Sequence, residues 1–176
     1  MNDGSPWTRL SLAAGDDARR ARYAEVGERV RLLLDGEDDW VAAMATVACE
    51  LHAAFGYFDW TGFYRAVAPE QLVVGPYQGG HGCLRIDFAR GVCGAAARTR
   101  ATQIVPDVAA FPGHIACASS TRSEIVVPIV GPAPEGRLLG VLDVDSDAPA
   151  AFTRADADGL EAIGRELGAR YASRPP

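Results

Sequence analysis

A chain of 176 residues with 48% hydrophobic content is long enough for one compact domain, which would bury about 70% of its unfolded surface. The net charge of −6 and the pI near 5.0 argue against a nucleic acid or an anionic membrane as partner, because both select clustered cations. No apolar run approaches the ~20 residues of a membrane span, and the N-terminus lacks the pattern of a signal peptide. We therefore expect a cytoplasmic protein whose four cysteines are reduced at rest.

The N-terminal third predicts an arm and two helices. Residues 1–17 show no periodicity and form an N-terminal arm that is either poorly ordered or docked on the domain, which we place at 18–172. From Ala18 to Leu34 the apolar residues step by three or four, as in a helix. Asp38 or Asp39 can cap a second helix, whose apolar stripe runs from Trp40 to Leu51.

Strand signals begin at Tyr57. In the segment YFDWTGFYRA (57–66), Trp60, Gly62 and Tyr64 would share one face of a strand. Trp60 and Tyr64 therefore predict either the aromatic wall of a small-molecule pocket or ordinary core packing. A second strand, 72–77, leads into the turn QGGHG, which lacks the spacing of a phosphate-binding loop and predicts no nucleotide site.

The middle of the chain carries the cysteines. A short helix is expected from Gly91, with Cys93 in its first turn, where the helix dipole would favour the thiolate; the flanking glycines equally permit close packing. A short strand broken by Pro106 follows, and then an irregular loop that bears Cys117. Because this loop leads into the β-branched strand 124–130, it would be anchored at one end and could aim the thiol.

The C-terminal part predicts one strand and one helix. In LLGVLDVD (138–145), Val141, Asp143 and Asp145 share a face. Thr153 and Asp156 have the spacing of a capping box that opens a helix to about residue 171. The order of elements predicts an α+β fold with a mostly antiparallel central sheet and helices packed on one face.

Cys83, Cys93 and Cys117 admit three interpretations. A zinc site could use His114 as a fourth ligand, but the chain has neither a CxxC nor a HxxxH spacing, so we predict no metal. The thiols could instead be buried and inert. The third possibility is redox chemistry, which requires a nucleophilic thiolate, a second thiol within reach and an external reductant.

Three carboxyls indicate the class of substrate. Asp143 and Asp145 interrupt an apolar strand and Glu124 opens another; the simple alternative is a solvated sheet face. Clustered acids raise one another's pKa and disfavour a thiolate. Such a site suits a substrate that brings a cation, such as an amino-acid ammonium, and a reaction in which a carboxyl donates a proton. Trp60 and Tyr64 could hold an apolar group such as a methyl.

Several segments resemble one known family: FDWTGFYR, GPYQGGHGCLRI, ARGVCGAAA, VPDVAAFPGHIACASSTRSEIVVPI and LLGVLDVDS. Their GHIAC and SEIV signatures and the cysteine spacing resemble the free methionine-(R)-sulfoxide reductases, which are stand-alone GAF domains. The resemblance covers roughly residues 18–167. It implies a single GAF-like domain.

By position, the resemblance implies that Cys117 is the nucleophile, that Cys83 resolves it as an intramolecular disulfide, and that Cys93 is a third cysteine of the catalytic centre. Glu124 and Asp143 would serve catalysis. The substrate would be bound by five residues: Trp60, Tyr64, Glu124, Asp143 and Asp145. The chain departs from the family pattern at residues 80–82, just before Cys83, and at residues 118–122, just after Cys117. Both departures would affect the rate at which the disulfide forms.

The implied activity is a thiol-dependent reduction of free L-methionine-(R)-sulfoxide to L-methionine, with a role in oxidative stress. Cys117 would become a sulfenic acid that condenses with Cys83. No bound cofactor is implied; thioredoxin is the implied external reductant and a homodimer the implied assembly. Two alternatives stay open, a non-catalytic GAF module that senses a small ligand and a thiol redox sensor.

Overall fold

The fold is built on one antiparallel sheet. The computed structural model describes residues 6–113, 119–134 and 136–173. Its six strands follow the order β3-β2-β1-β6-β5-β4, and each neighbouring pair is antiparallel. The strands are β1 (Trp60–Ala68), β2 (Gln71–Gln78), β3 (Arg85–Asp87), β4 (Gln103–Val105), β5 (Ser123–Val130) and β6 (Leu138–Ser146). The predicted α+β class with an antiparallel sheet is confirmed, although the short edge strand β3 was not expected.

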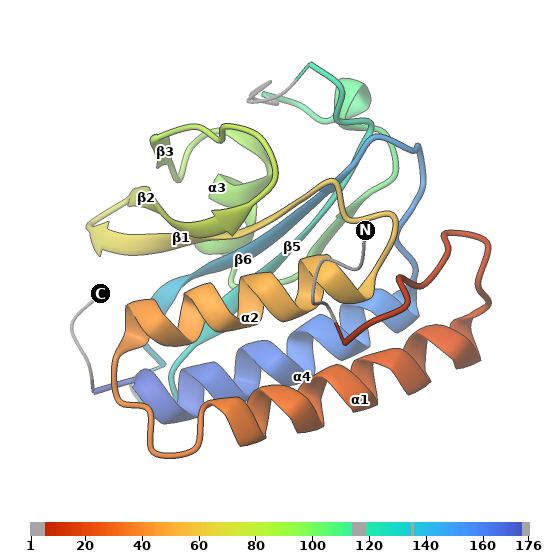
Figure 1. The fold of residues 1–176 in the computed structure, drawn as a ribbon. Coiled ribbons are helices and arrows are strands. Elements are labelled where there is room, and N and C mark those ends of the chain that lie inside the picture. The colour runs from red at the N-terminus through yellow and green to blue at the C-terminus, as the bar shows by residue number, and fades with distance from the viewer. Residues whose placement is uncertain (1–5, 114–118, 135, 174–176) are drawn as a thin grey trace.

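Helices lie on both faces of this sheet. Three long helices share one face (Figure 1), namely α1 (Asp16–Leu33), α2 (Trp40–Ala54) and α4 (Arg154–Tyr171). Among them, α2 and α4 contact the sheet, and α1 packs on α2 and α4. The short helix α3 (Gly91–Thr99) lies on the opposite face against β5 and β6, and a 3-10 turn (Val108–Ala110) follows β4. The predicted one-sided packing therefore holds for the three long helices, while α3 covers the face that carries the polar residues of interest.

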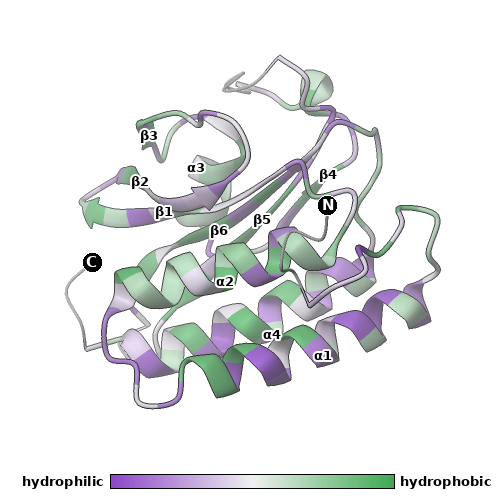
Figure 2. Ribbon diagram, viewed as in Figure 1, coloured by the Kyte–Doolittle hydropathy of each residue, from purple (hydrophilic) through white to green (hydrophobic). Residues whose placement is uncertain are grey.

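The larger hydrophobic core fills the space between the sheet and the long helices. The apolar stripe of α2 supplies Met44, Val47 and Leu51, none of which has any exposed surface. Figure 2 shows that α2 is hydrophobic over most of its length, and it includes an exposed stripe at Val41, Ala45 and Cys49. Phe55 stacks on Phe58 with ring centroids 4.6 Å apart, so the end of α2 is fixed to the strand that follows.

Both predicted helix caps are present. The Asp39 carboxylate accepts hydrogen bonds from the backbone N–H groups of Val41 (2.7 Å) and Ala42 (2.9 Å). Thr153 and Asp156 form the reciprocal capping box at the start of α4. Such caps satisfy backbone donors that have no partner within the helix.

Asp156 also anchors a buried polar network. Its carboxylate is paired with Arg19, which is itself almost fully buried, and accepts hydrogen bonds from the hydroxyls of Tyr57 (2.7 Å) and Tyr23 (3.1 Å). Burial and, secondly, the Asp156 charge raise the pKa of both tyrosines well above their usual range, so both remain protonated donors. Arg19 also donates to the carbonyl of Ala151 (2.9 Å). The network joins α1, the approach to β1 and α4.

The N-terminal arm is docked rather than loose over residues 6–15. Leu10 forms a parallel bridge with Phe55, with a hydrogen bond from the Leu10 N–H to the carbonyl of Ala54 (2.8 Å). The Arg9 guanidinium donates to two carbonyls at the end of α2 (3.1 Å each), and the Trp7 indole donates to Glu50 (2.9 Å). These contacts favour the docked alternative of the sequence prediction for this segment.

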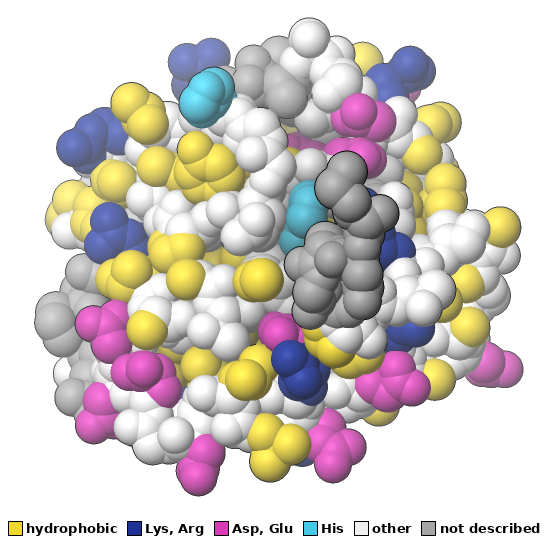
Figure 3. Space-filling view, viewed as in Figure 1, with side chains coloured by type: hydrophobic (Ala, Val, Ile, Leu, Met, Phe, Trp, Pro, Cys, Tyr) yellow, Lys and Arg dark blue, Asp and Glu magenta, His cyan; other side chains and the backbone are white. Residues whose placement is uncertain are grey.

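The surface carries mixed charges. On the face seen in Figure 3, acidic and basic side chains are interspersed, in agreement with a chain that has 17 arginine or lysine and 23 acidic residues. Within the described ranges, no helix is both long and apolar enough to span a membrane.

Candidate active site

Three central strands bring the predicted acids together. In the register of the sheet, Asp145 of β6 lies directly opposite Trp60 of β1 on one side and Glu124 of β5 on the other. Two residues along, Asp143 lies opposite Gly62 and Val126. Residues directly opposite one another in an antiparallel sheet project from the same face. The alternation predicted from the sequence therefore places all three carboxyls on the face covered by α3.

The aromatic wall contains one ring more than the sequence predicted. Trp60 stacks on Tyr64 with ring centroids 5.8 Å apart, and on Tyr77 of β2 at 5.3 Å. Its ring lies across Gly62, where an added Cβ would come within 2.6 Å of the indole and 2.4 Å of the Tyr77 Cβ. The gap at Gly62 is therefore filled by the Trp60 ring rather than left open. Tyr77 was missed because its role comes from its pairing with Gly62, which local sequence does not reveal.

The glycine-rich turn closes over these rings. The Trp60 indole N–H donates to the carbonyl of Gly80 (3.1 Å). A Cβ at Gly82 would come within 2.9 Å of the Tyr64 hydroxyl oxygen. Gly82 thus lets the backbone approach both aromatic side chains closely. This turn contacts both rings and leads directly into Cys83.

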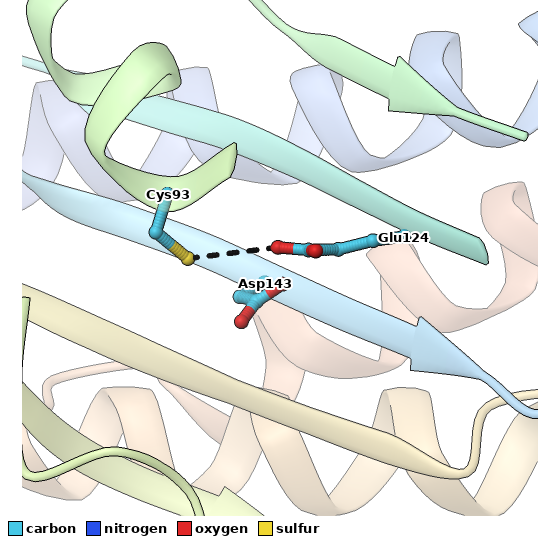
Figure 4. Close-up of side chains that lie close together, drawn as sticks. All are labelled: Cys93, Glu124 and Asp143. Atoms are coloured by element: carbon cyan, nitrogen blue, oxygen red, sulfur yellow. Dashed lines mark hydrogen bonds between the residues drawn. The ribbon is translucent and has the colours of Figure 1, made fainter. Parts of the chain in front are cut away.

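Cys93 reaches the same cluster from the opposite layer. Its thiol projects from α3 toward the carboxyl of Glu124, with Asp143 beside them (Figure 4), and donates to Oε1 of Glu124 across 3.9 Å. A Cβ at Gly94 would come within 2.6 Å of the carbonyl oxygen of Asp87, so glycine is needed there for α3 to approach the backbone before it. Close packing at Gly94 is therefore the role that the structure supports for this glycine.

The environment holds Cys93 in its protonated form. Cys93 is 3% exposed, and burial raises the pKa of its thiol well above the usual value; the charges of Asp143 and Glu124 raise it further. The expectation that the helix dipole would favour a thiolate here is wrong. Two facing carboxyls and the loss of water outweigh the dipole, whose effect is confined to the first turn and amounts to about 1 kcal/mol or less.

The carboxyls also tend to retain protons. Burial raises the pKa of Asp143 to about 7, although hydrogen bonds with Cys93 and Glu124 oppose the increase. Burial and the Asp143 charge raise the pKa values of Glu124 and Asp145 above the usual range. Among the described residues, Oδ1 of Asp143 is buried without a hydrogen-bond partner. The alternative of a solvated sheet face is therefore wrong, because this is a buried acid cluster with unused acceptor capacity.

The cysteines fall into three environments. Cys83 is disulfide-bonded and packs against the apolar cluster that contains Trp60, Tyr64 and Cys93. Cys49 and Cys93 carry free thiols. Cys49 is exposed on α2. Cys117, the predicted nucleophile, lies outside the described residues.

Hydrogen bonds hold the two approaches to the Cys117 loop. The backbone N–H of Gly91, at the start of α3, donates to the carbonyl of Gly113 (3.0 Å). A second hydrogen bond joins the segment before the loop to the segment after it. The N–H of Val108 donates to the carbonyl of Arg122 (3.0 Å), which directly precedes β5. The predicted anchoring by β5 is thus accompanied by a second attachment at α3, the helix that bears Cys93.

The acids and the thiol could also be considered as metal ligands. The ligand atoms of Cys93, Glu124 and Asp143 all lie within 4.8 Å of one another. This set has the mixed sulfur and oxygen donors of a zinc site, but each of its three members would have to lose a proton held by the buried environment. The zinc set considered from the sequence included His114 and Cys117, which lie outside the described residues.

Comparison with known proteins identifies the family. The model of the GAF domain matches residues 39–171. The chain belongs to the GAF domain family.

Within that family, this GAF domain is related to a group of reductases. The free methionine-R-sulfoxide reductase of Saccharomyces cerevisiae is 42% identical over 139 residues, which are 76% of each chain. The enzyme of the same description from Escherichia coli is 37% identical over 145 residues, 82% of this chain and 86% of that one. The X-ray structure of free methionine-R-sulfoxide reductase from Neisseria meningitidis, in complex with its substrate, is 41% identical, covers 94% of this chain and 96% of its own, and superposes with a TM-score of 0.82.

In this GAF domain the structure brings together most of the predicted site residues. Trp60, Tyr64, Cys83 and Cys93 share one apolar cluster, and the three carboxyls line the neighbouring part of the same face. Tyr77 and Gly82 join them as contacts of the aromatic rings. The signal that the sequence did offer for Tyr77 was an aromatic residue directly before the glycine-rich turn QGGHG.

Proposed function

We propose that this GAF domain reduces free L-methionine-(R)-sulfoxide to L-methionine. The observation that carries the proposal is the buried acid cluster with an unpartnered oxygen on Asp143, next to the stacked rings of Trp60 and Tyr64. Its support is the 37–42% identity to free methionine-R-sulfoxide reductases over most of the chain.

The acids suit a free amino acid rather than a peptide. An ammonium group would supply donors to Glu124, Asp143 and Asp145, whose burial disfavours charge in the absence of a cation. A peptide bond removes that positive charge and would leave buried acceptors without a partner, which is a strong basis for discrimination. Trp60 and Tyr64 would contact the methyl end of the substrate.

The chemistry assigns Cys117 as nucleophile. Its thiolate attacks the sulfoxide sulfur, and Glu124 or Asp143, whose pKa values are raised by burial, protonates the sulfoxide oxygen. The S–O bond of the substrate then breaks and its oxygen, now a hydroxyl, passes to the Cys117 sulfur. The substrate sulfur gains two electrons and leaves as methionine, and Cys117, oxidised by two electrons, becomes a sulfenic acid. Cys83 then condenses with it, forming a disulfide and releasing water. The disulfide at Cys83 and the free thiols at Cys49 and Cys93 support this pairing.

Two partners follow from the same proposal. A dithiol protein, thioredoxin, would return the disulfide to two thiols, and no bound cofactor is needed because all electrons pass through sulfur. We further propose that the protein acts as a homodimer in the cytoplasm, which sedimentation of the purified protein and cell fractionation can test directly.

The test is a coupled assay that follows NADPH consumption through thioredoxin reductase and thioredoxin. Turnover is expected with the free R epimer and not with the S epimer or with peptide-bound substrate. Cys117→Ser should lower the rate to background, while Cys49→Ser should leave it unchanged because Cys49 lies exposed on α2. Binding without turnover would favour a ligand sensor, and disulfide formation with peroxide alone would favour a redox sensor.

A further inference from the structure

Cys93 combines features that do not suit a redox thiol. It is a free, nearly fully buried cysteine, and its sulfur lies 3.9 Å from Oε1 of Glu124. We propose that Cys93 is a positioning residue whose S–H donates a hydrogen bond to Glu124 and so orients that carboxyl toward the substrate. This inference rests on the proposed function and assigns a task to the third cysteine of the site.

The groups facing Cys93 support a proton-bearing thiol. They come from three strands: Tyr64 on β1, Glu124 on β5, and Asp143 with Asp145 on β6. All four are neutral or negative, and none of the interactions that shift the Cys93 pKa comes from a cation. A reactive cysteine normally has a nearby cation or histidine that stabilises its thiolate. Cys93 is therefore suited to donate a hydrogen bond rather than to attack sulfur.

The position of the donor is fixed by the backbone of α3. Gly94 allows the helix to lie against the carbonyls of Asp87 and Phe88, where a Cβ would come within 2.6 and 2.8 Å. Beyond it, Ala96 and Ala97 are buried between α3 and the sheet. Because these contacts fix the backbone of α3, they hold the Cα of Cys93 at a set distance from the sheet. Its hydrogen bond also favours the ionised form of Glu124, opposing the raising effects of burial and of Asp143.

Paired substitutions separate this role from a redox role. Cys93→Ser keeps a hydrogen-bond donor at the same place, and its kcat/KM should stay within about threefold of the unmodified protein. Cys93→Ala removes the donor, and its kcat/KM should fall about tenfold or more, because the hydrogen bond that orients the Glu124 carboxyl is lost. The plot of kcat/KM against pH should have one limb that reports the ionisation of Glu124. That limb should move to higher pH in Cys93→Ala and stay in place in Cys93→Ser. Cys49→Ala serves as the control for loss of a thiol.

The opposite results would overturn the inference. Equal loss of turnover in Cys93→Ser and Cys93→Ala would show that the sulfur itself is required. Unchanged kcat/KM and pH profile in Cys93→Ala would show that the hydrogen bond has no effect. If Cys93→Ala fails to fold, Cys93→Val, which fills the volume without a donor, takes its place in the same comparison.

A second readout does not depend on turnover. Infrared difference spectra between low and high pH record the C=O band of protonated carboxyls, and Glu124→Gln identifies the contribution of Glu124. The midpoint of that contribution should rise in Cys93→Ala relative to Cys93→Ser, and an unchanged midpoint would overturn the inference. Failure of the unmodified protein to reduce methionine sulfoxide would contradict the proposed function alone, because the spectra report on the pair of side chains directly.

Discussion

Asp143 is held where an ionised carboxylate is unfavourable. It is buried, one of its oxygens has no partner among the described residues, and its pKa is raised to about 7 by burial. Desolvation of an unpaired carboxylate destabilises a folded protein unless a cation compensates it. In the proposed function a bound ammonium would provide that compensation, and Asp143 would then connect the binding of substrate to the stability of the fold.

This position predicts a pH-dependent stability. Because the folded-state pKa of Asp143 lies above its ordinary value of 3.8, the folded protein binds more protons than the unfolded chain between those two values, and stability falls as pH rises through this window. Asp143→Asn removes the charge and should raise the free energy of unfolding at pH 8 by roughly 2–4 kcal/mol, with little gain at pH 4. Urea unfolding at both pH values measures this effect.

A matched substitution makes the result specific. Asp17→Asn removes a carboxylate from the exposed first turn of α1 and should give no comparable gain at pH 8. An equal gain in both variants would mean that overall charge, rather than burial of Asp143, sets the pH dependence.

At the scale of residues, the sequence predicted which side chains form the site better than it predicted their protonation. The alternation in LLGVLDVD was sufficient to place Asp143 and Asp145 on one face, because a strand has a fixed period of two. The protonation of Cys93 was not predictable, since it depends on Glu124 and Asp143, which are 31 and 50 residues away along the chain. A helix dipole can be inferred locally, whereas burial cannot.

At the scale of elements, the aromatic wall depends on the pairing of β1 with β2. Gly62 lies opposite Tyr77, and the Trp60 ring lies over the space that a side chain at Gly62 would occupy. Gly62→Ala would force Trp60 and Tyr77 apart, since the new Cβ would come within 2.6 Å of the indole. We expect a loss of stability of about 1–3 kcal/mol and a raised KM for the substrate. Thermal unfolding and initial-rate kinetics check both effects.

Gly80→Ala is the control for this change. It lies in the neighbouring turn with nothing within 4 Å of an added Cβ, and its backbone carbonyl can still accept from Trp60. A loss of stability in Gly80→Ala equal to that of Gly62→Ala would show that rigidity of the turn, rather than the stack of rings, is responsible.

Element prediction succeeded where the pattern was long. The apolar stripe of α2 and the capping box of α4 each involve residues three or four positions apart, and both are present. The three-residue strand β3 was missed because its pairing with β2 depends on the path of the glycine-rich turn. The placement of α3 on the opposite face was missed for a similar reason, because Gly94 acts through a contact with the Asp87 carbonyl.

At the scale of the whole molecule, Asp156 joins the N-terminal helix to the C-terminal one. Asp156→Ala would leave Arg19 buried without its partner and would remove an acceptor from Tyr23 and Tyr57. The expected loss is about 3–5 kcal/mol, as for other buried ion pairs in which one partner is removed. Urea unfolding should show this loss, while the site chemistry persists in molecules that remain folded.

Asp158→Ala provides the comparison. Asp158 is paired with Arg154 on the exposed side of α4, and such surface pairs contribute only about 0.3–0.5 kcal/mol. A similar effect of the two substitutions would indicate that loss of a carboxylate near the start of α4, rather than loss of the buried network, is responsible.

The central sheet serves two tasks with alternate residues of the same strands. Phe63, Leu142 and Val144 belong to the large core, whereas their neighbours Trp60, Tyr64 and Asp143 face α3. Substitutions of the acidic α3-facing residues can therefore alter the proposed site without touching the larger core. A selection library confined to Glu124, Asp143 and Asp145 should yield many folded members with new specificities, whereas one at Ile125, Leu142 and Val144 should yield mostly unfolded chains.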